Sequence, residues 1–138
     1  MRDDFTQCMV SNSRMAARAI TRRYDAYVRP FGITATQLSV MGMIISARGR
    51  NVSELAEVRG FERTTLTRNI DRLEHMELIV SRPAEHGNGR ICKLTEKGEA
   101  LVEKVLPAWR KAQAEIREEL GAEGFDETIR TLKRLAAV

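Results

Sequence analysis

The feature that most constrains the fold is a pair of short amphipathic segments joined at Gly60. Ala56 lies four residues before this glycine and Leu66 six residues after it. This spacing is typical of a helix-turn-helix, with a small residue where the helices cross, glycine at the turn and an apolar anchor beneath the second helix. We therefore expect a short helix at residues 54–59 and a second one at about residues 63–76.

A hairpin pattern follows these two segments directly. In "LIVSRPAEHGNGRICKLT", two β-favouring runs flank a stretch rich in glycine and charge. This arrangement predicts two strands joined by a flexible tip at about residues 85–90. A helix-turn-helix followed by a hairpin is typical of a winged helix, and the combination is more specific than either half.

Long helical patterns flank this central unit. Apolar residues recur at intervals of three and four over residues 4–29, which predicts one long helix. A second pattern covers about residues 95–120, where we expect Pro107 to introduce a kink, and a short amphipathic helix closes the chain. Thr34, followed three residues later by Gln37, resembles a capping box for a further helix.

Together these elements predict a single domain over residues 1–138, mainly α with a small β wing (α+β). Residues 34–94, approximately, would form the winged helix-turn-helix lobe, and about 1–33 and 95–138 its long terminal helices. Two long amphipathic helices expose more apolar surface than a small lobe can cover. We therefore expect these N- and C-terminal helices to be dimerisation helices of a homodimer.

Residue spacing, missing motifs and net charge argue against several other functions. Cys8 and Cys92 are far apart and form no short-spaced ligand set with His75 and His86, so we predict no metal and no other cofactor. Since no nucleophile motif is recognisable, we do not expect an enzyme. Without an apolar run of membrane-spanning length or a signal-peptide segment, we expect a cytoplasmic protein with no membrane partner. The net charge of +4 permits an anionic partner without requiring one.

Three segments match a known family in sequence and in order: "GITATQLSVM", "SELAEVRGFERTTLTRNIDRLE" and "KLTEKGEALVEKVLPAW". The last contains a Leu-Thr-x-x-Gly junction just after the wing. On these segments the chain resembles the MarR family of bacterial transcriptional regulators. The resemblance implies an obligate dimer that binds a pseudo-palindromic double-stranded DNA operator, usually as a repressor released by a small ligand or by cysteine oxidation. One departure is the wing tip, "EHGNGR", since family wings commonly carry an acidic residue followed closely by arginine.

The threonine-rich second helix of the motif is then the recognition helix. With Leu66, Ile70 and Leu73 buried, its opposite side is polar. Arginine can bond guanine N7 and O6 in the major groove, and threonine can bond a base edge or contact a thymine methyl group. We assign base reading to Arg68. The other residues of this helix predicted to contact DNA are Arg63, Thr64, Thr65, Thr67 and Arg72.

Other interpretations of these polar residues stay open. Polar residues at a helix start are also caps or solvated surface, and Asp71 and Glu74 favour this view because phosphate repels them. Ser53 can touch a phosphate or simply cap its helix. At the predicted wing tip, Asn88 and Arg90 can enter the adjacent minor groove, or the tip is only a solvated hairpin.

The means of regulation also has alternatives. Tyr24 and Trp109 either line an effector pocket between the lobe and the terminal helices or fill the core. We expect Cys8 at the fourth position of a helix capped by Asp4, where the helix dipole lowers a thiol pKa, so the protein is alternatively an oxidant sensor. The opposing interpretation is a buried and inert thiol. A further alternative is a winged helix that docks a protein partner without specific DNA binding.

Overall fold

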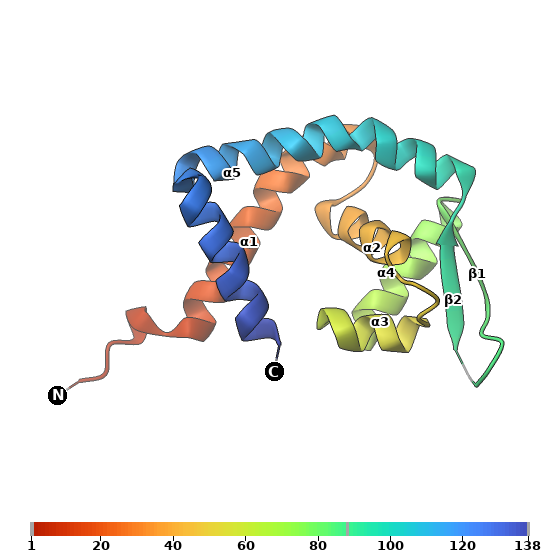
Figure 1. Cartoon of the computed structure of the whole chain (residues 1–138), viewed down its shortest axis with the longest axis horizontal. Helices are drawn as coiled ribbons and strands as arrows, with labels where there is room; N and C mark the ends of the chain where they lie inside the picture. The colour runs from red at the N-terminus through yellow and green to blue at the C-terminus, as the bar shows by residue number, and fades with distance from the viewer. Residues whose placement is uncertain (1, 88, 138) are drawn as a thin grey trace.

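The computed structural model describes residues 2–87 and 89–137, and it consists of a small lobe at one end of two long helices (Figure 1). The mainly α fold with a small β wing is confirmed. Helices α1 and α5 lie side by side, and both chain ends lie away from the wing. The elements in chain order are η1 (Phe5–Gln7), α1 (Met9–Val28), η2 (Arg29–Phe31), α2 (Ala35–Ile45), α3 (Val52–Arg59), α4 (Arg63–His75), β1 (Ile79–Pro83), β2 (Arg90–Leu94) and α5 (Glu96–Ala136).

The helix-turn-helix is formed by α3 and α4. Gly60 ends α3 in the left-handed conformation (φ 69°), which glycine adopts without a Cβ penalty. Ala56 is buried where the two helices meet. Leu66, Ile70 and Leu73 of α4 are buried as predicted, and they form part of the core that α2, the hairpin and the start of α5 complete.

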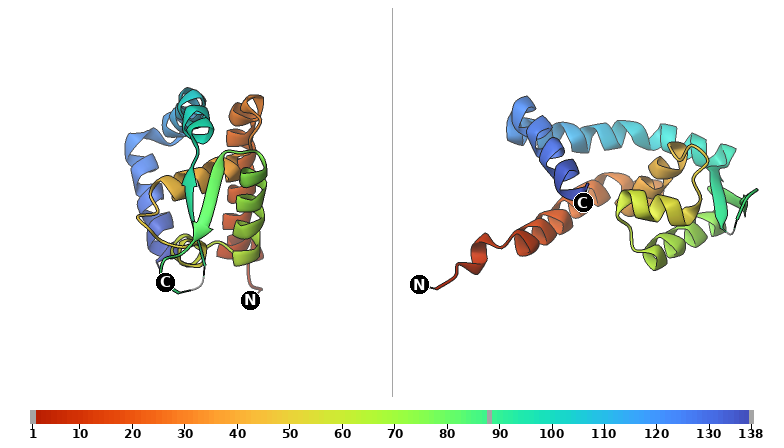
Figure 2. Two further views of the ribbon diagram at one scale, coloured as in Figure 1. Left: turned by 90° about the vertical axis from the view of Figure 1, so that its right-hand side faces the viewer. Right: turned by 60° about the horizontal axis from the view of Figure 1, so that its bottom comes forward.

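The wing is a two-stranded antiparallel sheet of β1 and β2. Ile79 pairs with Leu94, and Ser81 pairs with Cys92. Because side chains alternate along a strand, these residues share the inner face that packs on the lobe. Figure 2 shows the hairpin projecting beyond the helices at one end of the molecule.

The N-caps of α2 and α3 can be compared with those predicted from the sequence. The capping box of α2 is confirmed, since Thr34 accepts from the Gln37 N–H and the Gln37 side chain accepts from the Thr34 N–H. The expectation that Ser53 caps α3 is wrong. Asn51 is the N-cap and forms a capping box with Glu54, so that Ser53 lies inside the first turn.

The N-terminal helix begins at Met9 and not at Asp4. Asp4 instead accepts from the N–H and the hydroxyl of Thr6, and this caps the 3₁₀ turn of η1. Cys8 follows in an extended conformation (ψ 122°) and becomes the N-cap of α1. The expected position of Cys8 at the fourth residue of the helix is therefore wrong, because a turn with i→i+3 bonds comes first.

Helix α5 continues through Pro107, and its backbone leaves helical geometry at Gly121 (φ 76°, ψ 158°). The chain turns sharply there, so that the segment 122–136 leaves the direction of the first part of α5 (Figure 1). Arg117, which precedes Gly121 in α5, contacts the segment that follows the turn. Its guanidinium lies 4.7 Å from the ring centroid of Phe125 and bonds Asp126 at 3.1 Å.

The Leu-Thr-x-x-Gly junction attaches α5 to the lobe. Thr95 is the N-cap of α5: its hydroxyl oxygen accepts from the Gly98 N–H at 3.0 Å and donates to the Glu77 carbonyl at 2.7 Å. The Thr95 N–H donates to the Leu78 carbonyl at 3.1 Å. Gly98 is buried against that same carbonyl, which an added Cβ would approach to 2.1 Å. This junction therefore requires glycine for close packing.

Candidate nucleic-acid interface and adjoining cavity

The exposed face of α4 begins without a side-chain cap. Its N-cap is Glu62, which forms no side-chain hydrogen bond to the first turn within the described chain, and that turn contains no acidic residue. The positive end of the helix dipole and the free N–H groups are therefore available to an anion. The interpretation of Thr64 and Thr65 as caps is wrong, because both lie inside the helix.

Three of the predicted contact residues of α4, Thr64, Arg68 and Arg72, are exposed and lie opposite the buried apolar stripe. Arg63 is also exposed, but it starts the helix in the sector of Ile70. Thr65 and Thr67 are half-buried at the edges of the exposed face. The exposed face presents two arginines and a threonine hydroxyl, which suits insertion into a groove of a nucleic acid.

The other residues predicted to contact DNA are Ser53, Asn88 and Arg90. Ser53 is half-buried in the first turn of α3. Asn88 lies outside the described residues. Arg90 is not at the wing tip but begins β2, and it forms ion pairs with Asp71 at 3.0 Å and Glu74 at 3.7 Å. Strand alternation turns its side chain towards α4 and not towards the tip, and a minor-groove contact by Arg90 stays a prediction.

The charges around Arg90 also act on its pKa. Burial by itself lowers the pKa of the guanidinium. The hydrogen bond to Asp71 and the charges of Glu74 and Asp71 outweigh burial, so the pKa of Arg90 is raised overall. Arg90 is therefore a permanent cation held by two carboxylates of α4.

The cysteines have contrasting environments. Cys8 is half-buried at the start of α1, and hydrogen bonds from the N–H and hydroxyl of Ser11 and from the Val10 N–H lower its thiol pKa. Cys8 is therefore not fully buried in the single chain, and its reactivity stays a prediction. Cys92 is buried in the wing, and burial raises its pKa. Of the two thiols, Cys8 is the more exposed and the one whose pKa is lowered.

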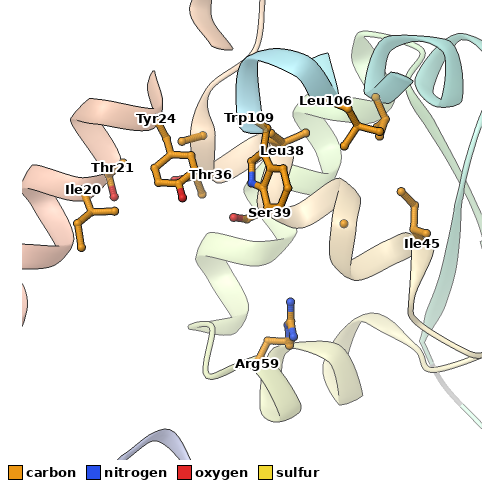
Figure 3. Close-up of a pocket in the computed structure, with 13 residues that line it drawn as sticks. Ile20, Thr21, Tyr24, Thr36, Leu38, Ser39, Ile45, Arg59, Leu106 and Trp109 are labelled. Atoms are coloured by element: carbon orange, nitrogen blue, oxygen red, sulfur yellow. The ribbon is translucent and has the colours of Figure 1, made fainter. Parts of the chain in front are cut away.

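A cavity of about 530 Å³ opens between α1, α2 and α5, and both Tyr24 and Trp109 lie on its wall (Figure 3). Neither residue belongs to the buried core, so the core-filling interpretation is wrong. Most of the wall is apolar. Arg59 projects towards the cavity from α3, a position that the sequence did not reveal. The remaining residues that line the cavity are Ile20, Thr21, Ala35, Thr36, Leu38, Ser39, Gly42, Ile45, Val102 and Leu106.

The Tyr24 side of the cavity is tied to the contact between α1 and α5. The Tyr24 hydroxyl donates to Gln113, the Tyr27 hydroxyl donates to Glu115, and Arg23 pairs with Glu119 at 2.7 Å. Burial of the phenol raises the pKa of Tyr24. One wall of the cavity therefore also joins the middle of α5 to α1.

Other kinds of site find no support in the part of the chain that the structure describes. Residues 2–87 and 89–137 contain no cluster of three or more His, Cys, Asp or Glu side chains arranged to hold a metal ion. Among the helices of these residues, none combines the length and the apolar character that crossing a membrane requires.

A helix-turn-helix with an exposed, arginine-bearing second helix and an adjoining hairpin defines a winged-helix protein of the nucleic-acid-binding class. A family model described as "MarR family" matches residues 31–88. The chain belongs to the MarR family, whose members are DNA-binding transcriptional regulators and not enzymes.

Solved structures agree with this assignment over nearly the whole chain. The M. tuberculosis transcriptional regulator MosR in complex with DNA is 34% identical, covers 94% of each chain and has a TM-score of 0.84. A cysteine-to-serine mutant of E. coli MarR with operator DNA is 25% identical over 97% of this chain and 99% of that one, with a TM-score of 0.82. Wild-type apo MarR from E. coli is 26% identical over 92% and 96%, with a TM-score of 0.73.

Proposed function

We propose that the chain is a homodimeric, sequence-specific repressor that reads a pseudo-palindromic operator with α4 in the major groove. The observation that carries this proposal is the face of α4 bearing Thr64, Arg68 and Arg72, exposed opposite three buried apolar residues, on a helix whose first turn has no side-chain cap. The DNA complexes of MosR and the MarR mutant support it. The protein would act in the cytoplasm.

The experiment that tests this function needs no known operator. The wild-type protein selects duplexes from a randomised DNA pool, and affinity for the selected duplex is measured against salt and against unrelated competitor DNA. We expect affinity to fall steeply with salt, because phosphate contacts release counterions, and to survive the competitor. Failure to enrich any duplex, or loss of binding to the competitor, would favour a winged helix that docks a protein partner.

We assign dimerisation to about residues 1–33 and 95–138, and DNA binding to about 34–94. The support is apolar surface on η1, α1 and the end of α5 that the single chain leaves uncovered. Obligate dimer interfaces are apolar in this way. The exposed apolar residues are Phe5, Met9, Val10, Met15, Ile20, Leu120, Ile129, Leu132 and Leu135.

We expect Leu132→Glu to convert the dimer to a monomer at micromolar concentration, since the interface would bury an unpaired carboxylate. The matched control is Val80→Glu in the wing. Leu132 is 51% exposed and Val80 49% exposed in the single chain. Light scattering after gel filtration reports the mass. A dimer that tolerates the Leu132 substitution would contradict the assigned interface.

Two-fold symmetry of the dimer also sets the spacing of the two operator half-sites. We expect half-sites about one helical turn apart, roughly 10 base pairs centre to centre, or a multiple of this spacing. Footprinting of the selected duplex measures the distance. A single, asymmetric half-site would argue against a dimer that binds with both α4 helices.

We propose that a small ligand in the cavity at Tyr24 and Trp109 releases the DNA. The apolar wall and the guanidinium of Arg59 favour a compact apolar ligand with an acidic or acceptor group. A ligand there contacts α1, α2 and α5 together, so its binding can change how the lobe sits on the terminal helices.

Oxidation of Cys8 is the second candidate for release, favoured by the partial exposure and lowered pKa of its thiol. The thiolate attacks an oxygen of the organic peroxide, the O–O bond breaks, and a sulfenic acid and an alcohol are formed, so the reaction rate should rise with pH and level off above the lowered pKa. We expect organic peroxide to weaken DNA binding of the wild type and not of Cys8→Ser, as measured by fluorescence anisotropy. Equal behaviour of the two proteins would exclude Cys8 as the sensor and leave the cavity.

A further inference from the structure

Arg90 stands where the wing meets the recognition helix. Its Nη1 donates to Asp71 Oδ1 at 3.0 Å, and its Nη2 lies 3.7 Å from Glu74 Oε1. Glu74 also accepts a hydrogen bond from the Ser81 hydroxyl of β1. One network of side chains therefore links both strands of the wing to α4.

The position of Arg90 in the strand turns its side chain towards α4, although 36% of the side chain remains exposed. Arg90 precedes Cys92 and Leu94 on the same face of β2, and both of those residues are buried. The Nε and Nη2 atoms of Arg90 are themselves buried and have no hydrogen-bond partner among the described residues. The guanidinium therefore faces the lobe, and reaching a phosphate would require it to leave two carboxylates.

Those carboxylates matter because of where they lie. Asp71 and Glu74 are on the C-terminal half of α4, the same helix whose N-terminal half carries the proposed DNA contacts. Negative side chains near DNA are repelled by phosphate. A cation paired with both carboxylates offsets one of their two negative charges and so reduces this repulsion, and it does so without itself touching the nucleic acid.

We propose that Arg90 is a positioning residue: an internal counterion that fixes the wing against α4 and offsets one of the two negative charges of Asp71 and Glu74. This inference rests on the proposed DNA binding. Base reading requires α4 to be held close to one orientation, whereas binding to random DNA depends mainly on phosphate neutralisation. Loss of the Arg90 network should therefore reduce discrimination between sequences more than it reduces affinity for DNA in general.

The test compares two arginines of the same hairpin. Arg90→Met keeps the aliphatic volume of the side chain and removes the guanidinium. The control is Arg82→Met, at an exposed position on the opposite face of β1 that pairs with Ile91. Each substitution lowers the net charge by one, so their general electrostatic effects match. The probes are the duplex selected by the wild type and a shuffled duplex of the same composition.

We expect Arg90→Met to lower the ratio of selected to shuffled affinity by about tenfold, and Arg82→Met to leave that ratio unchanged. Asp71→Ala should lower the ratio to a similar extent, although it removes a negative charge. The double variant Arg90→Met/Asp71→Ala should be no worse than either single variant, because both remove the same contact.

Direct DNA contact by Arg90 predicts a different pattern. Arg90→Met would then weaken binding to both duplexes equally and reduce the slope of log K against log salt by about 1. Asp71→Ala would strengthen binding. Either result would overturn the inference while leaving the proposed function intact.

Two measurements show whether each variant still folds and forms a dimer. Melting temperature and dimer mass are recorded for every variant, and if Arg90→Met does not fold, Asp71→Ala alone distinguishes the two patterns by the direction of its effect. A wild type that binds neither duplex would overturn the proposed function, and the inference with it.

Discussion

Arg68→Ala is expected to weaken binding to the selected duplex by on the order of 1 to 3 kcal/mol, about 5- to 150-fold, and to relax the base preference at one position of each half-site. Arg68 is exposed one turn into α4, on the side opposite Leu66 and Ile70. There a guanidinium can bond N7 and O6 of one guanine, a pair of bonds that alanine cannot replace.

The control for Arg68→Ala is Arg110→Ala. Arg110 is exposed in the middle of α5, outside the lobe, and the substitution produces the same change in net charge. We expect it to leave the preference among single-base variants of the duplex intact. If Arg68→Ala lowered affinity for every variant by the same factor, the residue would contact phosphate and another side chain would read the base.

Gly98→Ala should destabilise the protein by about 1–3 kcal/mol, the usual range for overpacking a close contact. The added Cβ would lie 2.1 Å from the Leu78 carbonyl oxygen. Because that atom belongs to the backbone, no side-chain rotation relieves the clash, and α5 must move away from the start of the wing. Thermal unfolding at a fixed protomer concentration measures the effect.

Gly42→Ala provides the matched control for Gly98→Ala. Gly42 also lies inside a helix, but a Cβ built there meets nothing within 4 Å. We expect unchanged or raised stability, by up to about 1 kcal/mol, because alanine favours helix more than glycine does. Equal destabilisation by the two substitutions would show that the contact at Leu78 is not the cause.

The sequence was sufficient wherever local chemistry decides the structure. The turn at Gly60, the capping box of Thr34 and Gln37, and the buried stripe of α4 all follow from spacing alone, since each depends on neighbours within one or two helical turns. The family also followed from sequence, because its three matching segments occur in order.

The predictions from sequence failed where two nearby residues could both cap a helix, or where residues in contact come from distant segments of the chain. Asn51 and Ser53 are both good caps, and Asn51 has its Glu54 partner at the third helical position. The position of Arg90 was predicted wrongly because the residue was counted with the glycine-rich tip. Extending the alternation of Leu94 and Cys92 by two residues would have placed it on the inner face.

The cavity could not be derived from the sequence, because its walls come from four helices. Tyr24 and Trp109 were identified through their size and position in helical stripes, but nothing in the sequence brings Arg59 of α3 towards them. Whether an aromatic stripe fills a core or borders a cavity depends on how far apart the helices lie, a distance that periodicity does not determine.

The reversal at Gly121 sets how the last segment packs on its own chain. An unbroken α-helix of 41 residues would be a rod about 60 Å long, and Phe125 and Asp126 would then lie about two turns beyond Arg117, out of its reach. The positive φ at Gly121 disfavours any residue with a Cβ, whereas a straight helix accepts one readily. A substitution at Gly121 therefore favours the straight rod, in which Phe125 loses the contact that helps to bury it.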